Sequence, residues 1–206
     1  MKKTIMLWLF AIVSIVSFAQ NTTEHLKFMG IPINGTITQF QSKLLAKGCT
    51  LDRASKALPV GCRIFNGKFV GNKVEIYVYY DEKTKVVYRA KAVIVGTSEN
   101  IADQKYNEIK NMLLQKYGTT WCIEGTHDKK ESVSRLVPCS TFNPLDIDPD
   151  ANIGLSPASY GFKGEIDVFI TKDEDVLSMP YNYNVHIDYQ DAINGEKHNN
   201  QNLEDL

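Results

Sequence analysis

Four cysteines are the residues whose type and spacing predict covalent chemistry in this chain: Cys49, Cys62, Cys122 and Cys139. An even number of cysteines in an exported chain predicts disulfides, because thiols in an oxidising compartment pair wherever the geometry allows. The pairs Cys49–Cys62 and Cys122–Cys139 would each close a short loop that contains turn-forming residues, so we favour these two bridges. A four-cysteine zinc site is the alternative, but such sites are built from C-x-x-C pairs, which the sequence lacks.

An alternating run of aspartates has some features of a calcium site. Asp146, Asp148 and Asp150 stand at every second position, which lets carboxylates converge on a hard cation. However, Ala151 occupies the position at which an EF-hand loop needs glycine, and Pro157 that of its bidentate glutamate. A solvated acidic turn is the simpler interpretation, and we predict no metal and no other cofactor.

One histidine and one aspartate have the types needed for acid–base catalysis. His186 and Asp188 share one face of a predicted strand, where a carboxylate could orient an imidazole. A solvated polar strand face explains them more simply. The sequence contains no G-x-S-x-G, H-E-x-x-H or P-loop motif and no G-x-G-x-x-G motif opening a helix. We therefore predict no enzyme activity, with a cell-envelope hydrolase whose site lies near His186 and Asp188 as the alternative.

A group of aromatic and basic side chains predicts a binding face. If the strands pair as their spacing indicates, Tyr77, Tyr79, Arg89, Lys91 and Phe169 gather on the solvent side of the sheet. Tyrosine and arginine are enriched at the energetic centres of protein interfaces. The alternative is that these tyrosines are ordinary cross-strand partners, or are covered by another part of the chain. The pattern predicts a face that holds a protein or a peptide.

Two helices and several antiparallel strands would position these groups. Thr36 and Gln39 form a capping box that predicts the start of a helix, and Gly48 predicts its end. An apolar stripe at helical spacing predicts a second helix over residues 98–117. Alternation predicts strands at residues 63–70, 73–81, 85–95, 132–137, 164–171 and 183–190, and a short one around Trp121. The predicted fold class is α+β, an antiparallel sheet with two helices packed on one face.

The first residues predict export. A basic start and a short apolar run precede small residues at Ser17 and Ala19, which suit a signal peptidase, so residues 1–19 are a predicted signal peptide. The run is too short to span a bilayer comfortably, which predicts no membrane anchor after cleavage. The mature protein is then expected in the periplasm or outside the cell.

The mature chain is expected to form one domain of residues 20–190. Residues 28–96 and 97–190 have the same order of helix, cysteines and strands, which predicts two half-repeats, although chance similarity explains the pattern as well. Residues 140–164 predict a long irregular loop, which makes them candidates for function. Residues 191–206 are polar and predict a disordered tail.

The charge of the chain excludes nucleic acid as a predicted partner. The sequence has 23 basic and 24 acidic residues, and loss of Lys2 and Lys3 with the signal leaves 21 basic ones and a formal charge of −3. Nucleic-acid binding needs clustered lysine and arginine that displace counterions.

Two resemblances follow from these features. Residues 28–36, FMGIPINGT, together with Phe40, Leu44, Lys47 and Gly48, resemble the opening of small secreted proteins of unknown function from Bacteroidetes. The order of helices, cysteines and strands is also similar to the tandem-repeat plan of the β-lactamase inhibitor protein, in which an exposed sheet face binds a partner enzyme. The second resemblance covers topology and cysteine placement only, and no contact residue can be matched, so it does not imply inhibition of a lactamase.

Overall fold

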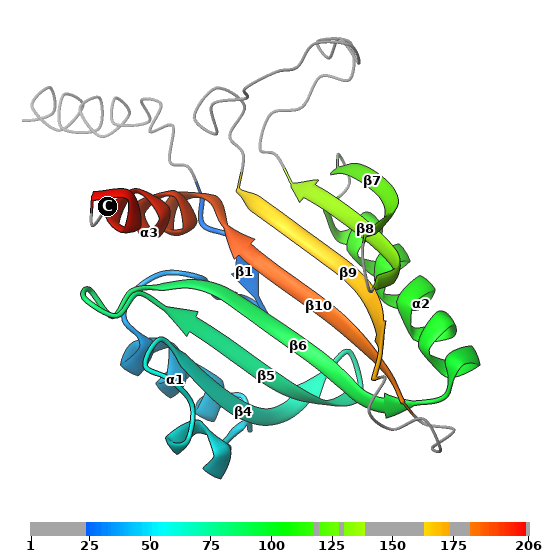
Figure 1. Cartoon of the computed structure of the whole chain (residues 1–206), viewed down its shortest axis with the longest axis horizontal. Helices are drawn as coiled ribbons and strands as arrows, with labels where there is room; N and C mark the ends of the chain where they lie inside the picture. Colours follow the sequence, from blue (N-terminus) through cyan, green and yellow to red (C-terminus); the bar gives the residue numbers. More distant parts are fainter. Residues whose placement is uncertain (1–23, 118–119, 128–129, 139–162, 174–181, 205–206) are drawn as a thin grey trace, which may run out of the picture.

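The fold is built on one antiparallel sheet with three helices packed against it, which confirms the predicted α+β class (Figure 1). A computed structural model describes residues 24–117, 120–127, 130–138, 163–173 and 182–204. Across the sheet the strand order is β3 (Thr50–Leu51), β4 (Cys62–Phe69), β5 (Asn72–Tyr80), β6 (Val87–Thr97), β10 (Tyr183–Asp191), β9 (Gly164–Lys172), β8 (Lys130–Pro138) and β7 (Thr120–His127).

The two halves of the chain contribute to the sheet in the same way. In the first half, α1 (Ile37–Ala46) precedes strands β3 to β6, and in the second half α2 (Glu99–Tyr117) precedes β7 to β10. Each half is one helix followed by four neighbouring antiparallel strands, and the halves join where β6 pairs with β10. A small hairpin of β1 (Lys27–Phe28) and β2 (Ile31–Pro32) comes before the first helix, and the 3₁₀ helix η1 (Arg53–Lys56) follows β3.

Local sequence signals fix the ends of α1. The Thr36 N–H donates to Gln39 Oε1 at 3.0 Å, and the Gln39 N–H donates to Thr36 Oγ1 at 3.4 Å, which is the predicted capping box. Gly48 follows the helix with φ of 83°, a left-handed conformation that glycine adopts without a steric penalty. Both predicted ends of the helix are therefore confirmed.

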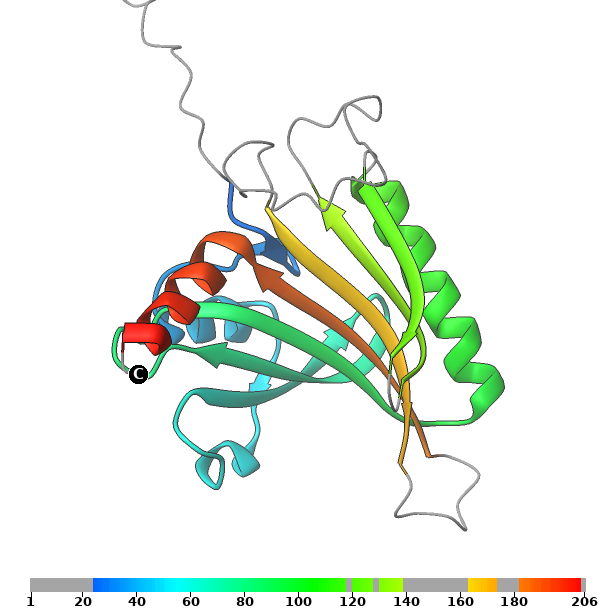
Figure 2. The ribbon, with the colours of Figure 1, turned by 45° about the horizontal axis from the view of Figure 1, so that its top comes forward.

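The core lies between the helices and one face of the sheet. Side chains of β4, β5, β6, β9 and β10 alternate, so about every second residue of these strands points to this core, and the residues between them point to the other face. The helix α2 packs against β8, β9 and β10. Both ribbon views show it beside the β7–β8 end of the sheet (Figures 1 and 2). The core combines buried side chains from both halves, among them Phe40, Phe65, Ile76, Val78, Ile109, Val168 and Ile187.

A third helix replaces the predicted disordered tail. The helix α3 (Ala192–Glu204) follows β10 directly and packs against β6, β9 and β10. The buried Asp191 carboxylate caps it by accepting the Asn194 N–H at 3.0 Å, and the Asn194 amide donates to the backbone oxygens of Ile33 and Val87. The prediction was wrong because polar contacts to distant residues, rather than apolar burial, hold this segment on the sheet.

The predicted Cys49–Cys62 disulfide is also absent, because the two thiols lie on opposite sides of the sheet. Cys49 is buried in the core, where its sulfur lies next to Gly67 on β4. Cys62 starts the same strand five residues earlier, so its side chain points to the opposite face, across from Tyr79. Both cysteines are free thiols. The predicted Cys122–Cys139 bridge falls outside the described residues.

Other predictions concern segments that the structure does not describe. The predicted signal peptide of residues 1–19 lies outside the described part, and so does nearly all of the predicted loop of residues 140–164. Among the described helices, none has the length and apolar character needed to cross a membrane.

Candidate functional site

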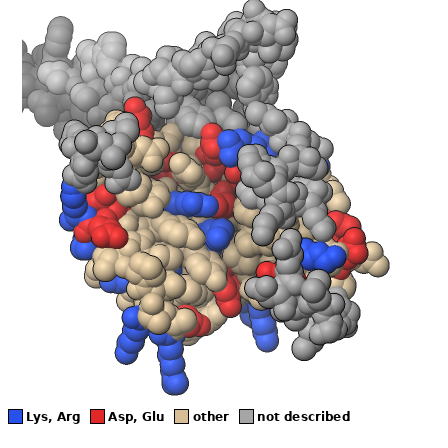
Figure 3. Space-filling view, in the orientation of Figure 1, with Lys and Arg blue, Asp and Glu red and all other residues tan. Residues whose placement is uncertain are grey.

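The candidate site is the face of the sheet opposite the core. We call it the open face and define it by the side chains of Tyr77, Tyr79, Arg89, Lys91, Arg135, Asp167 and Asp188. Because cross-strand partners share a face, the register places these groups in rows that run across β5, β6, β10, β9 and β8. In the middle of this face, basic and acidic side chains lie side by side among uncharged ones (Figure 3).

Two tyrosines and two cations form the centre of the open face, as the sequence predicted. Lys91 pairs with Tyr77 across the strands, and its Nζ lies 5.0 Å from the centre of the Tyr77 ring. Arg89 pairs with Tyr79, and its guanidinium carbon lies 4.9 Å from the centre of that ring. Both arrangements are cation–π contacts. The strand pairing therefore presents each half-buried ring together with a positive charge.

The tyrosine hydroxyls remain neutral over the physiological pH range. Burial is the main cause that raises the pKa of Tyr77 well above its usual range, and a hydrogen bond to Glu75 raises this pKa further. The Tyr77 hydroxyl donates this bond to Glu75 Oε2 at 2.7 Å. Burial also raises the pKa of Tyr79. These rings therefore offer apolar area and neutral hydroxyl groups rather than a nucleophile.

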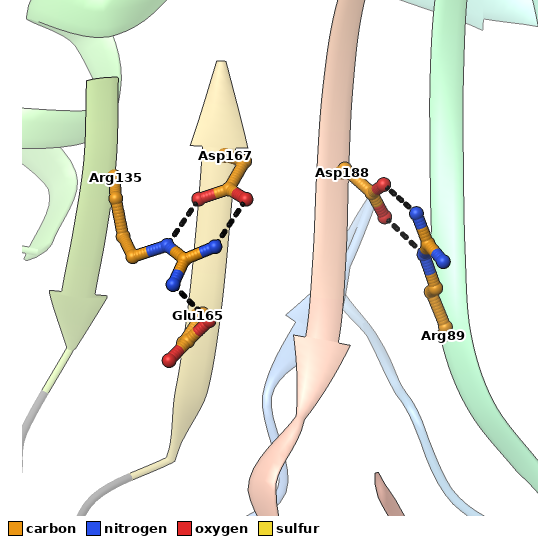
Figure 4. Close-up of polar contacts among 5 residues, drawn as sticks. All are labelled: Arg89, Arg135, Glu165, Asp167 and Asp188. Carbon is orange, nitrogen blue, oxygen red and sulfur yellow. Dashed lines mark hydrogen bonds and ion pairs between the residues drawn. The ribbon is translucent and has the colours of Figure 1, made fainter. Parts of the chain in front are cut away.

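Two arginine–aspartate pairs lie on either side of the boundary between β9 and β10 (Figure 4). Arg89 on β6 donates two hydrogen bonds to Asp188 on β10, with Nε at 2.8 Å from Oδ1. Arg135 on β8 donates two to Asp167 on β9, at 2.8 and 2.9 Å, and lies 3.3 Å from Glu165. The bond to the aspartate raises the pKa of each guanidinium further above its usual value. Much of the charge on this face is thus neutralised within the face itself.

Phe169 lies on the open side of the sheet but is not an exposed contact residue. Its side chain is 6% exposed, and its ring stacks on that of His186 with centroids 4.6 Å apart. His186 in turn lies 2.7 Å from the hydroxyl of Thr171 through Nε2. Phe169 is therefore not part of the predicted exposed cluster.

The geometry does not join His186 to Asp188 as a catalytic pair. Both residues lie on the same face of β10, as predicted, but the Asp188 carboxylate accepts its hydrogen bonds from Arg89. A carboxylate held by a guanidinium does not orient an imidazole for base catalysis. A pocket of about 230 Å³ lies beside Tyr77 and Lys91, and Glu75 and His186 also line it.

The second arginine pair was missed by sequence reasoning. Asp167 alternates correctly on its predicted strand, but its partner Arg135 could be placed only with the register between β8 and β9, which shifts between Lys130 and Val133. The alternation of side chains along each predicted strand was the available signal for this pair. The register shift between β8 and β9 interrupts this alternation. Asp146, Asp148 and Asp150, which were considered as a calcium site and interpreted as a solvated acidic turn, lie outside the described residues. Within the described ones, no three His, Cys, Asp or Glu side chains gather as metal ligands.

Comparisons with known protein families, with curated proteins and with solved structures found no match to this chain.

Proposed function

We propose that this chain is an exported, non-enzymatic binding module that holds a protein or peptide partner on its open face. The observation that carries the proposal is the pairing of Tyr77 with Lys91 and of Tyr79 with Arg89 at the centre of a sheet face. The buried side chains of α1 and α2 pack on the other face, so these helices leave the four side chains uncovered. Half-buried tyrosines beside an arginine are typical of the residues that dominate binding energies at protein interfaces.

The charges indicate what kind of partner suits this face. Arg89 and Arg135 already bind aspartates of the same sheet, so they offer a partner planar surfaces and remaining N–H donors rather than unbalanced charge. Recognition should therefore depend mainly on contacts with the tyrosine rings and only weakly on ionic strength. Screening by salt reduces interactions between separate exposed charges, and few such charges are available here.

Alanine substitutions on the open face test the proposal. The double variant Tyr77→Ala with Tyr79→Ala, used as bait against envelope and culture fractions of the producing cell, should lose partners that the unaltered chain retains. Leu45→Ala is the matched control, because Leu45 is an apolar side chain on α1 that is 44% exposed and lies away from the open face. Retention of every partner by a double variant that melts normally would refute the proposal.

Tyr77→Phe with Tyr79→Phe separates the rings from their hydroxyls. This variant keeps the cation–π contacts and should retain binding if ring surface dominates.

The proposal of export is based only on the sequence of residues 1–19. Identifying the first residue of the protein recovered from the envelope or the medium tests this proposal directly. A chain that keeps residues 1–19 in the cytoplasm would contradict export.

The cell-envelope hydrolase remains the alternative proposal, and His186→Ala tests it. An unchanged rate of hydrolysis of envelope substrates by this variant would end that alternative. No contact of Asp188 supports it, since this carboxylate bonds to Arg89.

A further inference from the structure

A second concave site lies on the helix side of the sheet, away from the open face. We call it the helix-side groove. It has a volume of about 320 Å³ and lies between the β1–β2 turn, the β4–β5 turn and α2. This volume is at the lower end of the range of small-molecule sites, about 300 to 1,000 Å³. The groove therefore has room for a small ligand rather than for a folded partner.

The walls of the groove are mostly apolar. Phe69, Ile109 and Leu113 line it and are each at most 6% exposed. Val70 and Met112 form part of the rim and are each 42% exposed. Exposed apolar side chains beside a hollow of this composition favour the burial of a hydrocarbon chain.

Two lysines add positive charge to the rim. Lys68 and Lys116 both line the groove, and neither pairs with a carboxylate among the described residues. The Lys116 ammonium lies 4.9 Å from the centre of the Tyr117 ring. Burial lowers the pKa of Lys116, and the positive charge of Lys27 lowers it further. A bound anion would offset both effects on this ammonium group.

Tyr189 is a further residue that lines the helix-side groove. It is 2% exposed and forms no hydrogen bond with the described residues. Its ring is fixed by edge contacts with Phe28 and Phe69, whose centroids lie 5.3 and 6.4 Å away. Burial raises the pKa of Tyr189 well above its usual range, so the hydroxyl stays protonated and able to donate.

We infer that the helix-side groove binds a small amphipathic carboxylate of the medium-chain fatty acid class. The apolar walls suit the hydrocarbon chain, while Lys68 and Lys116 suit the carboxylate. This pairing of an apolar lining with a few placed polar groups is the usual composition of a small-molecule site. The inference is independent of the open face, because the two sites share no residue.

Titration of the full chain with sodium decanoate below its micelle concentration tests this inference. The ¹³C-methyl resonances of Met29 and Met112, which both line the groove, should shift saturably. Decanol should bind at least tenfold more weakly, because it lacks the charge that the lysines recognise. Each methylene added from hexanoate to decanoate should tighten binding by about fourfold. Equal affinity for decanol and decanoate, or no saturable shift, would overturn the inference.

Two pairs of variants locate the binding site. Lys68→Gln with Lys116→Gln should weaken decanoate binding by about tenfold, whereas Lys43→Gln on α1 should leave it unchanged. Met112→Trp should fill the groove and prevent binding, whereas Ile101→Trp, at a similarly exposed position of α2, should not. Unaltered decanoate binding by the lysine double variant, or by a folded Met112→Trp variant, would place the decanoate elsewhere.

Two other occupants of the groove give distinct results. If a second copy of the chain filled it, sedimentation would show a dimer that Met112→Trp dissociates and decanoate does not. If residues 20–23 filled it, the chain that starts at residue 20 would not bind decanoate. Either result would refute a fatty-acid site.

Discussion

Asp167 and Asp188 lie directly opposite each other on β9 and β10, and each is bound by an arginine from the strand on its other side. Two carboxylates at opposed positions of a sheet repel each other. Arg89 and Arg135 compensate for this repulsion from the two flanking strands, β6 and β8 (Figure 4). The open face therefore depends on arginines for its stability as well as for the binding proposed above.

Substitution of Arg89 should be the more costly change in this row. Asp188 has a side chain only 8% exposed, so Arg89→Gln leaves a nearly buried carboxylate opposite Asp167 and should lower the free energy of unfolding by about 2–4 kcal/mol. Arg135 is 45% exposed, and Arg135→Gln should cost only about 0–1 kcal/mol. Urea denaturation measures both changes, and Asp188→Asn in the Arg89→Gln background should restore most of the loss. Equal losses for the two arginines would contradict the expectation.

Asp81 should make the fold sensitive to acid. Burial alone would raise the pKa of Asp81, but hydrogen bonds from the Thr84 backbone and from His198 outweigh it and lower the pKa from 3.8 to about 2. A lowered pKa means that the carboxylate stabilises the fold at pH values above about 4, and that this contribution is lost as the pH falls through about 2.

The variant Asp81→Asn tests this acid sensitivity. At pH 6 it should be less stable than the unaltered chain by about 1–2 kcal/mol, and the difference should vanish near pH 2. Asp103→Asn, at an exposed position of α2, is the control and should show no such trend. Denaturation curves collected at several pH values would disprove the assignment if the Asp81→Asn difference stayed constant.

The single side chain of Asn194 should hold α3 on the sheet. Its amide donates to the backbone oxygens of Ile33 at 2.9 Å and of Val87 at 3.0 Å, and Asn194→Ala leaves both buried acceptors without this donor. We expect a loss of about 2 kcal/mol and faster amide hydrogen exchange in α3 than in β10. Asn199→Ala, at an exposed position of the same helix, should change neither quantity. Unchanged exchange in the Asn194→Ala variant would show that other contacts fix the helix.

Val70 should be a strained residue. Val70 and Gly71 form the two-residue turn between β4 and β5 with φ of 48° and 76°, a left-handed conformation that a β-branched residue rarely adopts. Asparagine before glycine suits such a turn, so Val70→Asn should raise the free energy of unfolding by about 0.5–1 kcal/mol. Val95→Asn, at another exposed valine but within β6, should not stabilise. A destabilised Val70→Asn variant would instead assign the valine a packing role.

The two described thiols should react at different rates. Cys49 is 3% exposed, whereas Cys62 is half-buried on the open face, so a maleimide should label Cys62 first and Cys49 only after unfolding. Burial raises the pKa of both thiols, which keeps both reactions slow at neutral pH. Peptide mass spectrometry identifies the labelled cysteine, and a Cys49–Cys62 bridge in the same spectra would contradict the structure.

The sequence predicted the regular elements well because each carries a local signal. The capping box at Thr36 and the stripe of Ala102, Tyr106, Ile109 and Leu113 depend only on neighbours within a few residues. Alternation along β5 likewise placed Tyr77 and Tyr79 on the face opposite the core. Cross-strand pairing with Arg89 and Lys91 then followed from the order of adjacent strands.

Features that depend on distant partners were not predictable. The helix α3 lacks a strong apolar stripe, and its hydrogen bonds reach Ile33, Asp81 and Val87, more than a hundred residues earlier in the chain. The side of the sheet on which Cys49 and Cys62 each lie depends on the path of the chain into β4. The length of the loop between the two cysteines does not determine this path. The contact between Phe169 and His186 is likewise set by the pairing of β9 with β10.

The buried Asp191 carboxylate joins the N-terminal end of the described chain to the start of α3, the last helix. It accepts hydrogen bonds from the Leu26 N–H at 2.8 Å and the Asn194 N–H at 3.0 Å, and it contacts His25 at 2.9 Å. A pulling force applied to the two ends would therefore load these few bonds before it reached the long strands. The first event of mechanical unfolding would be the release of residues 24–26 and α3, with the central sheet still intact.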